Sequence, residues 1–237
     1  MYFGNSSMFY LILIMVAGAF AAWASSKVKS TYSKYSKQMS KSGISAEVAC
    51  RQVLDAKGLQ HIKIERIAGN LTDHFSPKEN IIRLSDAVYG NSSTAAIGVA
   101  CHEAGHAMQY AEEYLPIKLR NAIIPVTNLG SKLSMPLIIF GLLLGQSSPK
   151  LIGLAYFGVL LFSLMSLFQI FTLPTEFNAS SRALNVIGEH QILSQEEMSA
   201  SKKVLDAAAL TYVAALAVSL AQLLRLFAIV SGSRRRN

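Results

Sequence analysis

The sequence predicts a mainly α-helical membrane protein with about four transmembrane helices and a small α+β unit that faces water. Three observations support this fold class. Hydrophobic residues make up 51% of the 237 residues and charged residues only 15%, whereas an ordinary soluble domain carries about 25% charged residues. Four long apolar blocks are separated by polar stretches. Residues 27–120, between the first and second blocks, have the mixed composition of a small domain.

The charge balance is basic, with 22 Lys and Arg against 14 Asp and Glu and a formal net charge of +8. Such a balance suits either nucleic acid or an anionic membrane surface. The sequence contains no nucleic-acid-binding motif and no aromatic residues interleaved with basic ones, so we expect no nucleic-acid partner. Cys50 and Cys101 both lie in apolar helical patterns, which excludes a disulfide framework.

The first apolar block, Met8 to Ala24, predicts an N-terminal transmembrane anchor over residues 1–26. Its length is close to the minimum for crossing a hydrocarbon core of about 30 Å. A cleaved signal peptide is the alternative, because Ala22-Trp23-Ala24 resembles a cleavage site. No Lys or Arg precedes the block, however, and a lysine cluster that would mark the cytoplasmic side and attract anionic lipid headgroups follows it. This cluster consists of Lys27, Lys29, Lys34, Lys37 and Lys41.

Residues 27–120 predict a helix, a pair of strands and a second helix. The first helix covers 45–57, with Ser45 as its N-cap and Gly58 after its end. The strands lie around residues 62–67 and 81–84, with a turn at 76–80 between them. The strand at 81–84 could be an edge strand on which an extended peptide docks, or simply half of a structural hairpin.

The second helix of this segment begins near Ser92 or Ser93 and carries a short motif with chemical meaning. An apolar stripe faces the core at spacings of four, three and four residues. The stripe consists of Ile97, Cys101, Ala104 and Met108. Beside it lies His102-Glu103-Ala104-Gly105-His106, in which the histidines are four residues apart. On a helix this spacing places both imidazoles on one face, about 40° apart, so that both can reach one metal ion.

The chemistry of this motif is that of a catalytic zinc site. Zinc binds imidazole nitrogens, and a catalytic site keeps one coordination position for water. Glu103 lies on the adjoining flank, where it can take a proton from water that the metal has made more acidic. A chance match is the alternative, although unpaired imidazoles beside an apolar stripe would be costly to bury. Gly105 is a poor helix residue, which indicates the close approach of another element.

The third metal ligand is expected after a transmembrane hairpin over residues 121–173. Its second half, Leu151 to Leu173, carries no charge. Pro174 is expected to start a helix, which places Glu176 in the first turn. Because two spans return the chain to the same side of the membrane, Glu176 can meet the two histidines, and we expect it to be the third ligand. A carboxylate that merely interacts with the helix dipole is the simpler interpretation, and the alternative ligands are His190, Glu189 and Glu113.

The remaining chain predicts a third-ligand helix and polar loop over 174–206, then a C-terminal transmembrane helix and basic tail over 207–237. Four complete spans would place the tail residues Arg234 to Arg236 opposite the lysine cluster, against the positive-inside tendency. A kink or partial burial at Arg225 would resolve this conflict.

Almost the whole chain resembles the bacterial, membrane-bound family of putative neutral zinc metallopeptidases, which carry an HExxH motif and are gluzincin-like. The lysine-rich segment after the first span is one point of likeness. The others are Gly69 to Phe75, Ile82 to Ser85, His102 to Gln109, Leu173 to Ser180 and Lys203 to Tyr212. The resemblance implies a zincin-like catalytic unit with one catalytic zinc ion bound at His102 and His106 and Glu103 as the catalytic base.

A more remote similarity links the chain to the membrane metalloproteases of the heat-shock and CAAX prenyl-protein-processing type. Their third-ligand helix reads Glu-x-x-Ala-Asp, whereas this chain has Glu176, Ala179 and then Ser180. The difference removes a carboxylate that would orient a ligand imidazole, and Ser180 or Asn178 could replace it. Two further candidates for orienting a ligand or contacting substrate are Asp73 and His74, although a surface turn is the plainer interpretation.

Together these features predict a multi-pass integral membrane zinc endopeptidase, in the bacterial plasma membrane, with its site on the cytoplasmic side. It would hydrolyse peptide or protein substrates through Glu103-assisted attack of zinc-bound water. One alternative is a non-catalytic zinc-binding membrane scaffold or chaperone. Another is a transporter or channel, which would place ionisable residues within the spans, whereas only Lys132 and Arg225 interrupt them.

Overall fold

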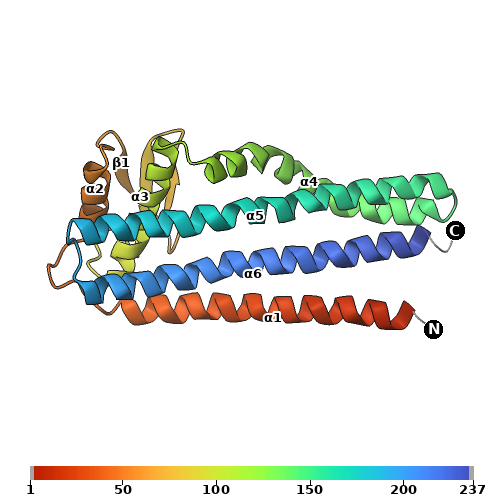
Figure 1. Cartoon of the computed structure of the whole chain (residues 1–237), viewed down its shortest axis with the longest axis horizontal. Helices are drawn as coiled ribbons and strands as arrows, with labels where there is room; N and C mark the ends of the chain where they lie inside the picture. The colour runs from red at the N-terminus through yellow and green to blue at the C-terminus, as the bar shows by residue number, and fades with distance from the viewer. Residues whose placement is uncertain (1–2, 235–237) are drawn as a thin grey trace. The chain divides into compact units, whose positions relative to one another are not determined.

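The computed structural model describes residues 3–234, and this part of the chain is mainly helical (Figure 1). It contains six α-helices, one short 3₁₀ helix at Pro149–Leu151 and three strands. The helices are α1 Phe3–Tyr35, α2 Ala46–Ala56, α3 Thr94–Ala111, α4 Leu115–Gly145, α5 Ile152–Glu189 and α6 Gln195–Arg234. The strands are β1 Lys63–Ile67, β2 His74–Ser76 and β3 Ile81–Ser85.

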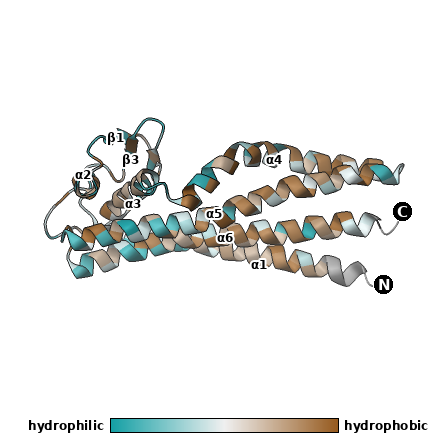
Figure 2. Ribbon diagram, turned by 45° about the horizontal axis from the view of Figure 1, so that its top comes forward, coloured by the Kyte–Doolittle hydropathy of each residue, from teal (hydrophilic) through white to brown (hydrophobic). Residues whose placement is uncertain are grey.

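Four of these helices, α1, α4, α5 and α6, are long and apolar enough to cross a membrane. Figure 2 shows hydrophobic residues over long stretches of each of them. The prediction of a mainly α-helical membrane protein with about four transmembrane helices is therefore confirmed.

The predicted starts of the last two long helices are wrong, because both helices are longer than expected. A helix does not begin at Pro174: α5 is continuous from Ile152 to Glu189, with Pro174 inside it. Proline in a helix interior costs about 3 kcal/mol, but neighbouring helices and side chains satisfy the freed backbone groups in membrane helices. Glu176 thus lies well inside a helix, so the interpretation of it as a helix-start carboxylate is also wrong.

Helix α6 likewise begins at Gln195, before the predicted start at residue 207, and it continues through Arg225 to Arg234. The predicted position of the basic tail stays a prediction, because Arg235 and Arg236 lie outside the described residues.

The sheet is mixed and has the order β1-β3-β2. Strand β1 pairs in parallel with β3, from Lys63 opposite Ile81 to Ile67 opposite Ser85. Strand β2 pairs antiparallel with β3, with His74 opposite Arg83. The two predicted strands are confirmed, but β2 was not predicted, since three residues are too few to show an alternating pattern. The prediction of an edge strand at 81–84 is wrong, because β3 is central.

The chain divides into two compact units. The first, which we call the membrane unit, contains the residues up to Trp23, Leu119–Thr172 and the chain from Tyr212 onward. The second, the α+β unit, contains Ala24–Lys118 and Leu173–Thr211, and therefore holds the sheet, α2 and α3.

The core of the α+β unit lies between α2, α3 and the sheet. The predicted apolar stripe of α3 is confirmed, because Ile97, Cys101, Ala104 and Met108 are all buried. Ser93 caps α3, its hydroxyl accepting a hydrogen bond from the backbone N–H of Ala96 at 3.2 Å. Ser45 is also an N-cap residue, but its hydroxyl instead donates to Glu47.

Both cysteines are free and buried in this core. Burial raises the pKa of Cys101 to about 12, so its thiol stays protonated and unreactive at neutral pH.

The membrane unit has a smaller core of its own between α4, α5 and α6, built around Ile138, Val159 and Val230. Gly141 allows α4 to approach α5 closely, since a Cβ atom there would lie 2.2 Å from the backbone nitrogen of Ala155. Such contacts through small residues are typical of helices that pack in membranes.

Candidate metal centre

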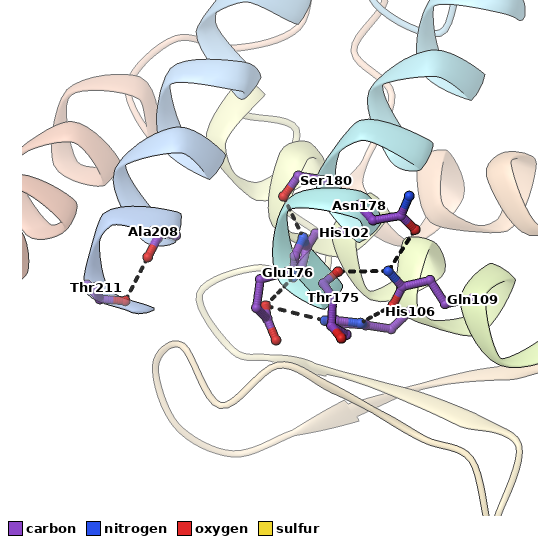
Figure 3. A network of polar contacts seen from close by, with 9 residues as sticks. All are labelled: His102, His106, Gln109, Thr175, Glu176, Asn178, Ser180, Ala208 and Thr211. Carbon is purple, nitrogen blue, oxygen red and sulfur yellow. Dashed lines mark hydrogen bonds and ion pairs between the residues drawn. The ribbon is translucent and has the colours of Figure 1, made fainter. Parts of the chain in front are cut away.

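Two helices of the α+β unit bring three potential metal ligands together (Figure 3). His102 and His106 lie one turn apart on α3, and Glu176 lies on α5. Atom Oε2 of Glu176 is 3.2 Å from Nε2 of His102 and 3.5 Å from Nε2 of His106. The three potential ligand atoms all lie within 4.8 Å of one another. Among the described residues this is the only such group of His, Cys, Asp and Glu side chains.

The close approach of α5 to α3 depends on a glycine in the middle of the motif. A Cβ atom on Gly105 would lie 2.2 Å from the carbonyl oxygen of Ala179. Only a residue without a side chain therefore fits this contact. The expectation that another element approaches Gly105 is confirmed, and the element is the turn of α5 that follows Glu176.

The orientation of His106 follows from a chain of hydrogen bonds (Figure 3). Gln109 Nε2 donates to the carbonyl of Thr175 at 2.7 Å and to Oδ1 of Asn178 at 2.9 Å. Asn178 Oδ1 also accepts from Arg182, 2.6 Å away, and a guanidinium can only donate. The other end of the Gln109 amide is therefore its oxygen, which accepts from Nδ1–H of His106 at 3.1 Å.

This chain of hydrogen bonds has a consequence for metal binding. With its proton on Nδ1, a neutral His106 presents the lone pair of Nε2 toward Glu176. A histidine that binds a metal needs such a free lone pair on the nitrogen that faces the ion. Arg182 at the far end is itself held by an ion pair with Glu112 and by the ring of Tyr114, 5.6 Å from the guanidinium carbon.

Ser180 supports the other imidazole. Its hydroxyl oxygen lies 3.0 Å from Nδ1 of His102. A serine hydroxyl can accept the Nδ1–H proton, and the lone pair of Nε2 then also faces Glu176.

The donor set fits a divalent cation. Two imidazole nitrogens and a carboxylate oxygen converge, and a lone pair on either nitrogen would repel the carboxylate unless a proton or a cation lay between them. Burial alone would lower the pKa of His106, but the hydrogen bond that its ring donates to Glu176 and the charges of Glu103 and Glu176 outweigh burial, so this pKa is raised. Two nitrogens and one oxygen are a ligand set that zinc accepts.

Glu103 lies beside this group without belonging to it. Its side chain is buried, with 8% of its surface exposed. It follows His102 on α3, and its charge is close enough to His106 to help raise the pKa of that imidazole. A carboxylate in this position can exchange protons with a small molecule held between the helices.

The alternative third ligands lie elsewhere. Glu113 pairs with Lys118 at 2.9 Å, and Glu189 faces Lys57 at 3.8 Å. His190 lies in the turn after α5.

Asp73 and His74 also fall outside the metal-ligand group. The carboxylate of Asp73 accepts hydrogen bonds from the backbone N–H and the hydroxyl of Ser85, at 2.7 and 2.9 Å. Nδ1 of His74 lies 2.9 Å from the carbonyl oxygen of Thr72. Both side chains thus hold the segment around β2 in place.

Comparison with known proteins agrees with this geometry. The family model described as "Putative neutral zinc metallopeptidase" matches residues 10–231. The chain belongs to this family. It is also 44% identical over 230 residues to "Putative membrane protease YugP" of Bacillus subtilis (strain 168). The aligned region covers 97% of this chain and 100% of that protein. No solved structure matches the chain significantly.

In this member of the family, sequence reasoning missed two residues that surround the ligands. Gln109 is fully buried and lies three residues after His106, on the same face of α3. That spacing of a polar residue from the motif was the signal that could have identified it. Arg182 acts at a greater distance, through Asn178, and no local pattern points to it.

Proposed function

We propose that this protein is an integral membrane zinc endopeptidase. The observation that carries the proposal is the convergence of His102, His106 and Glu176 beside the buried carboxylate of Glu103. In this proposal His102, His106 and Glu176 hold one catalytic zinc ion. When bound, the ion would polarise a peptide carbonyl and make a water molecule more acidic.

The residues of the chain have distinct tasks in this mechanism. Glu103 takes a proton from the attacking water and later passes it to the departing amine of the cleaved peptide bond. Gln109 and Ser180 hold the Nδ1 atoms of the two imidazoles, which keeps both rings oriented. Asn178 and Thr175 fix Gln109 in turn.

The substrate is a peptide or protein segment that reaches the site in extended form. Strand β2 is an edge strand of the sheet and lies against α3, with Phe75 packed edge-on against Tyr110 of that helix. A substrate strand would add to the outer edge of β2 through main-chain hydrogen bonds. Asp73 and His74 would then shape that edge rather than bind the metal.

In this proposal the site faces the cytoplasmic side of the plasma membrane. The support is the lysine cluster after the first apolar block, which lies in the same α+β unit as the ligands.

Hydrolysis of a quenched peptide or of casein, with and without a chelator, tests the proposal. Glu103→Gln is expected to bind zinc but to lose hydrolysis. Glu113→Gln is the matched control, because it makes the same change at an exposed ion pair. Wild-type activity in Glu103→Gln would refute the role of Glu103. Zinc binding without hydrolysis in the wild type, and no new protein termini in membranes that contain it, would instead favour a non-catalytic zinc-binding scaffold.

A further inference from the structure

A basic groove lies within the α+β unit, and none of the three metal ligands lines it. It has a volume of about 580 Å³, inside the range of about 300–1,000 Å³ for small-molecule sites. Residues of α1, α5 and α6 line it. We call it the lysine groove, and its basic members are Lys27, Lys34 and Lys203.

The positive charge of the lysine groove is not compensated by the protein. Among the described residues, none of the three lysines makes an ion pair with a carboxylate. Asp206 also lines the groove, but it pairs with Lys202 at 2.6 Å. Like charges gathered in one groove repel one another unless an anion lies among them.

Two of the lysines share one aromatic ring although they come from different helices. Nζ of Lys34 lies 5.3 Å from the centre of the Tyr35 ring, and Nζ of Lys203 lies 6.0 Å from it. The ring therefore brings an ammonium group of α1 and one of α6 to the same end of the groove. Two ammonium groups placed around one ring can both donate to a phosphate, which offers several acceptor oxygens.

The groove is amphipathic along its length. On α6 the lining residues change from Lys203 to Ala207 and Leu210, at spacings that keep them on one face. Leu210 belongs to the last apolar block, and Lys27 follows directly after the first one. Phe177 adds a half-exposed aromatic ring. A ligand that fits would carry an anionic group at one end and an apolar part at the other.

We propose that the lysine groove binds the headgroup of an anionic phospholipid, with the start of its acyl chains on the apolar residues. Basic residues next to a membrane span are a common device for recognising anionic lipids. An acidic peptide would satisfy the lysines but would leave Leu210 and Phe177 without an apolar partner. The proposal does not depend on the proposed hydrolytic activity.

Native mass spectrometry of the full chain in neutral detergent tests this proposal, with phosphatidylglycerol and phosphatidylcholine as added lipids. The test variant is Lys27→Gln, Lys34→Gln and Lys203→Gln combined. The control combines Lys29→Gln, Lys37→Gln and Lys78→Gln, which removes the same charge from exposed lysines that do not line the groove. All six positions are exposed, so both proteins are expected to fold, and equal thermal unfolding profiles would verify this.

We expect the wild type and the control to retain phosphatidylglycerol in preference to phosphatidylcholine. We expect the test variant to retain at least about tenfold less phosphatidylglycerol than the wild type. Equal losses in both triple variants would overturn the proposal in favour of diffuse surface charge. So would equal retention of both lipids by the wild type. Displacement of the lipid by inorganic phosphate or by a polyglutamate peptide at equal concentration would also overturn it, because the apolar half of the groove would then contribute nothing.

Discussion

Replacing Gly105 with alanine is expected to force apart the two helices that carry the metal-ligand group. The new Cβ atom would lie 2.2, 2.8 and 3.0 Å from three backbone atoms of Ala179, whereas ordinary contact begins at 3.4 Å. Helix α5 must therefore move by at least about 1.2 Å along the shortest of these contacts. Overpacking of this kind lowers the free energy of unfolding by about 1–3 kcal/mol. The higher helix propensity of alanine offsets about 1 kcal/mol of this loss.

The same displacement would move Glu176 away from both imidazoles. A misplacement of about 1 Å costs a catalytic site roughly 10²-fold. We therefore expect Gly105→Ala to lower zinc affinity, measured by competition with a chromophoric chelator, and to lower hydrolysis by about two orders of magnitude.

The matched control for this prediction is Gly153→Ala. It makes the same substitution in α5, at a position where a Cβ atom meets nothing within 4 Å. It should be neutral or slightly stabilising. If Gly105→Ala bound zinc as tightly as the parent, the close contact between α3 and α5 could not be what assembles the ligands.

Four further predictions concern single side chains. Glu103→Gln should lose about 10²–10⁴ in hydrolysis rate while its zinc content stays unchanged, as measured by peptide cleavage and metal analysis; a parallel loss of zinc would make Glu103 a ligand instead. Glu176→Ala should lower the zinc that remains bound after purification, and Glu113→Ala should not; equal zinc content in both would point to another third ligand. Gln109→Ala should weaken zinc binding about 10- to 100-fold, and parental affinity would show that His106 needs no support from this amide. The pKa of His106 in the metal-free protein is raised, so zinc must displace a proton from this imidazole at pH values below that pKa, and zinc affinity should fall as the pH falls. Calorimetry in buffers of different ionisation enthalpy would measure the released proton. Zinc binding without proton release would contradict this account.

The parts of the site that follow from local periodicity were predictable from the sequence. His102 and His106 lie on one face because four residues make slightly more than one helical turn. Gly105 indicated a close neighbour because glycine is otherwise costly in a helix. The meeting of Glu176 with the two histidines was predictable only through topology, since two spans return the chain to the same side.

The parts that depend on tertiary contacts were not predictable. Strand β2 exists because β3 offers it a partner, and its three residues carry no pattern of their own. The continuity of α5 through Pro174 opposes the local preference of proline, and the environment of the helix decides it. The spacing of Gln109 from His106 was visible in the sequence, but its hydrogen bonds to Thr175 and Asn178, which are far away in the sequence, could not be predicted.

The position of Glu176 in the chain, after α4 and much of α5, also dictates when the site can first exist. While the ribosome is still making α4 and the first part of α5, the nascent chain holds only the two imidazoles of α3. The carboxylate of Glu176 is added only after the whole hairpin has been synthesised. The newly made protein therefore has no complete ion-binding centre until α4 and most of α5 have been synthesised, so a truncated chain that ends within the hairpin cannot form this centre.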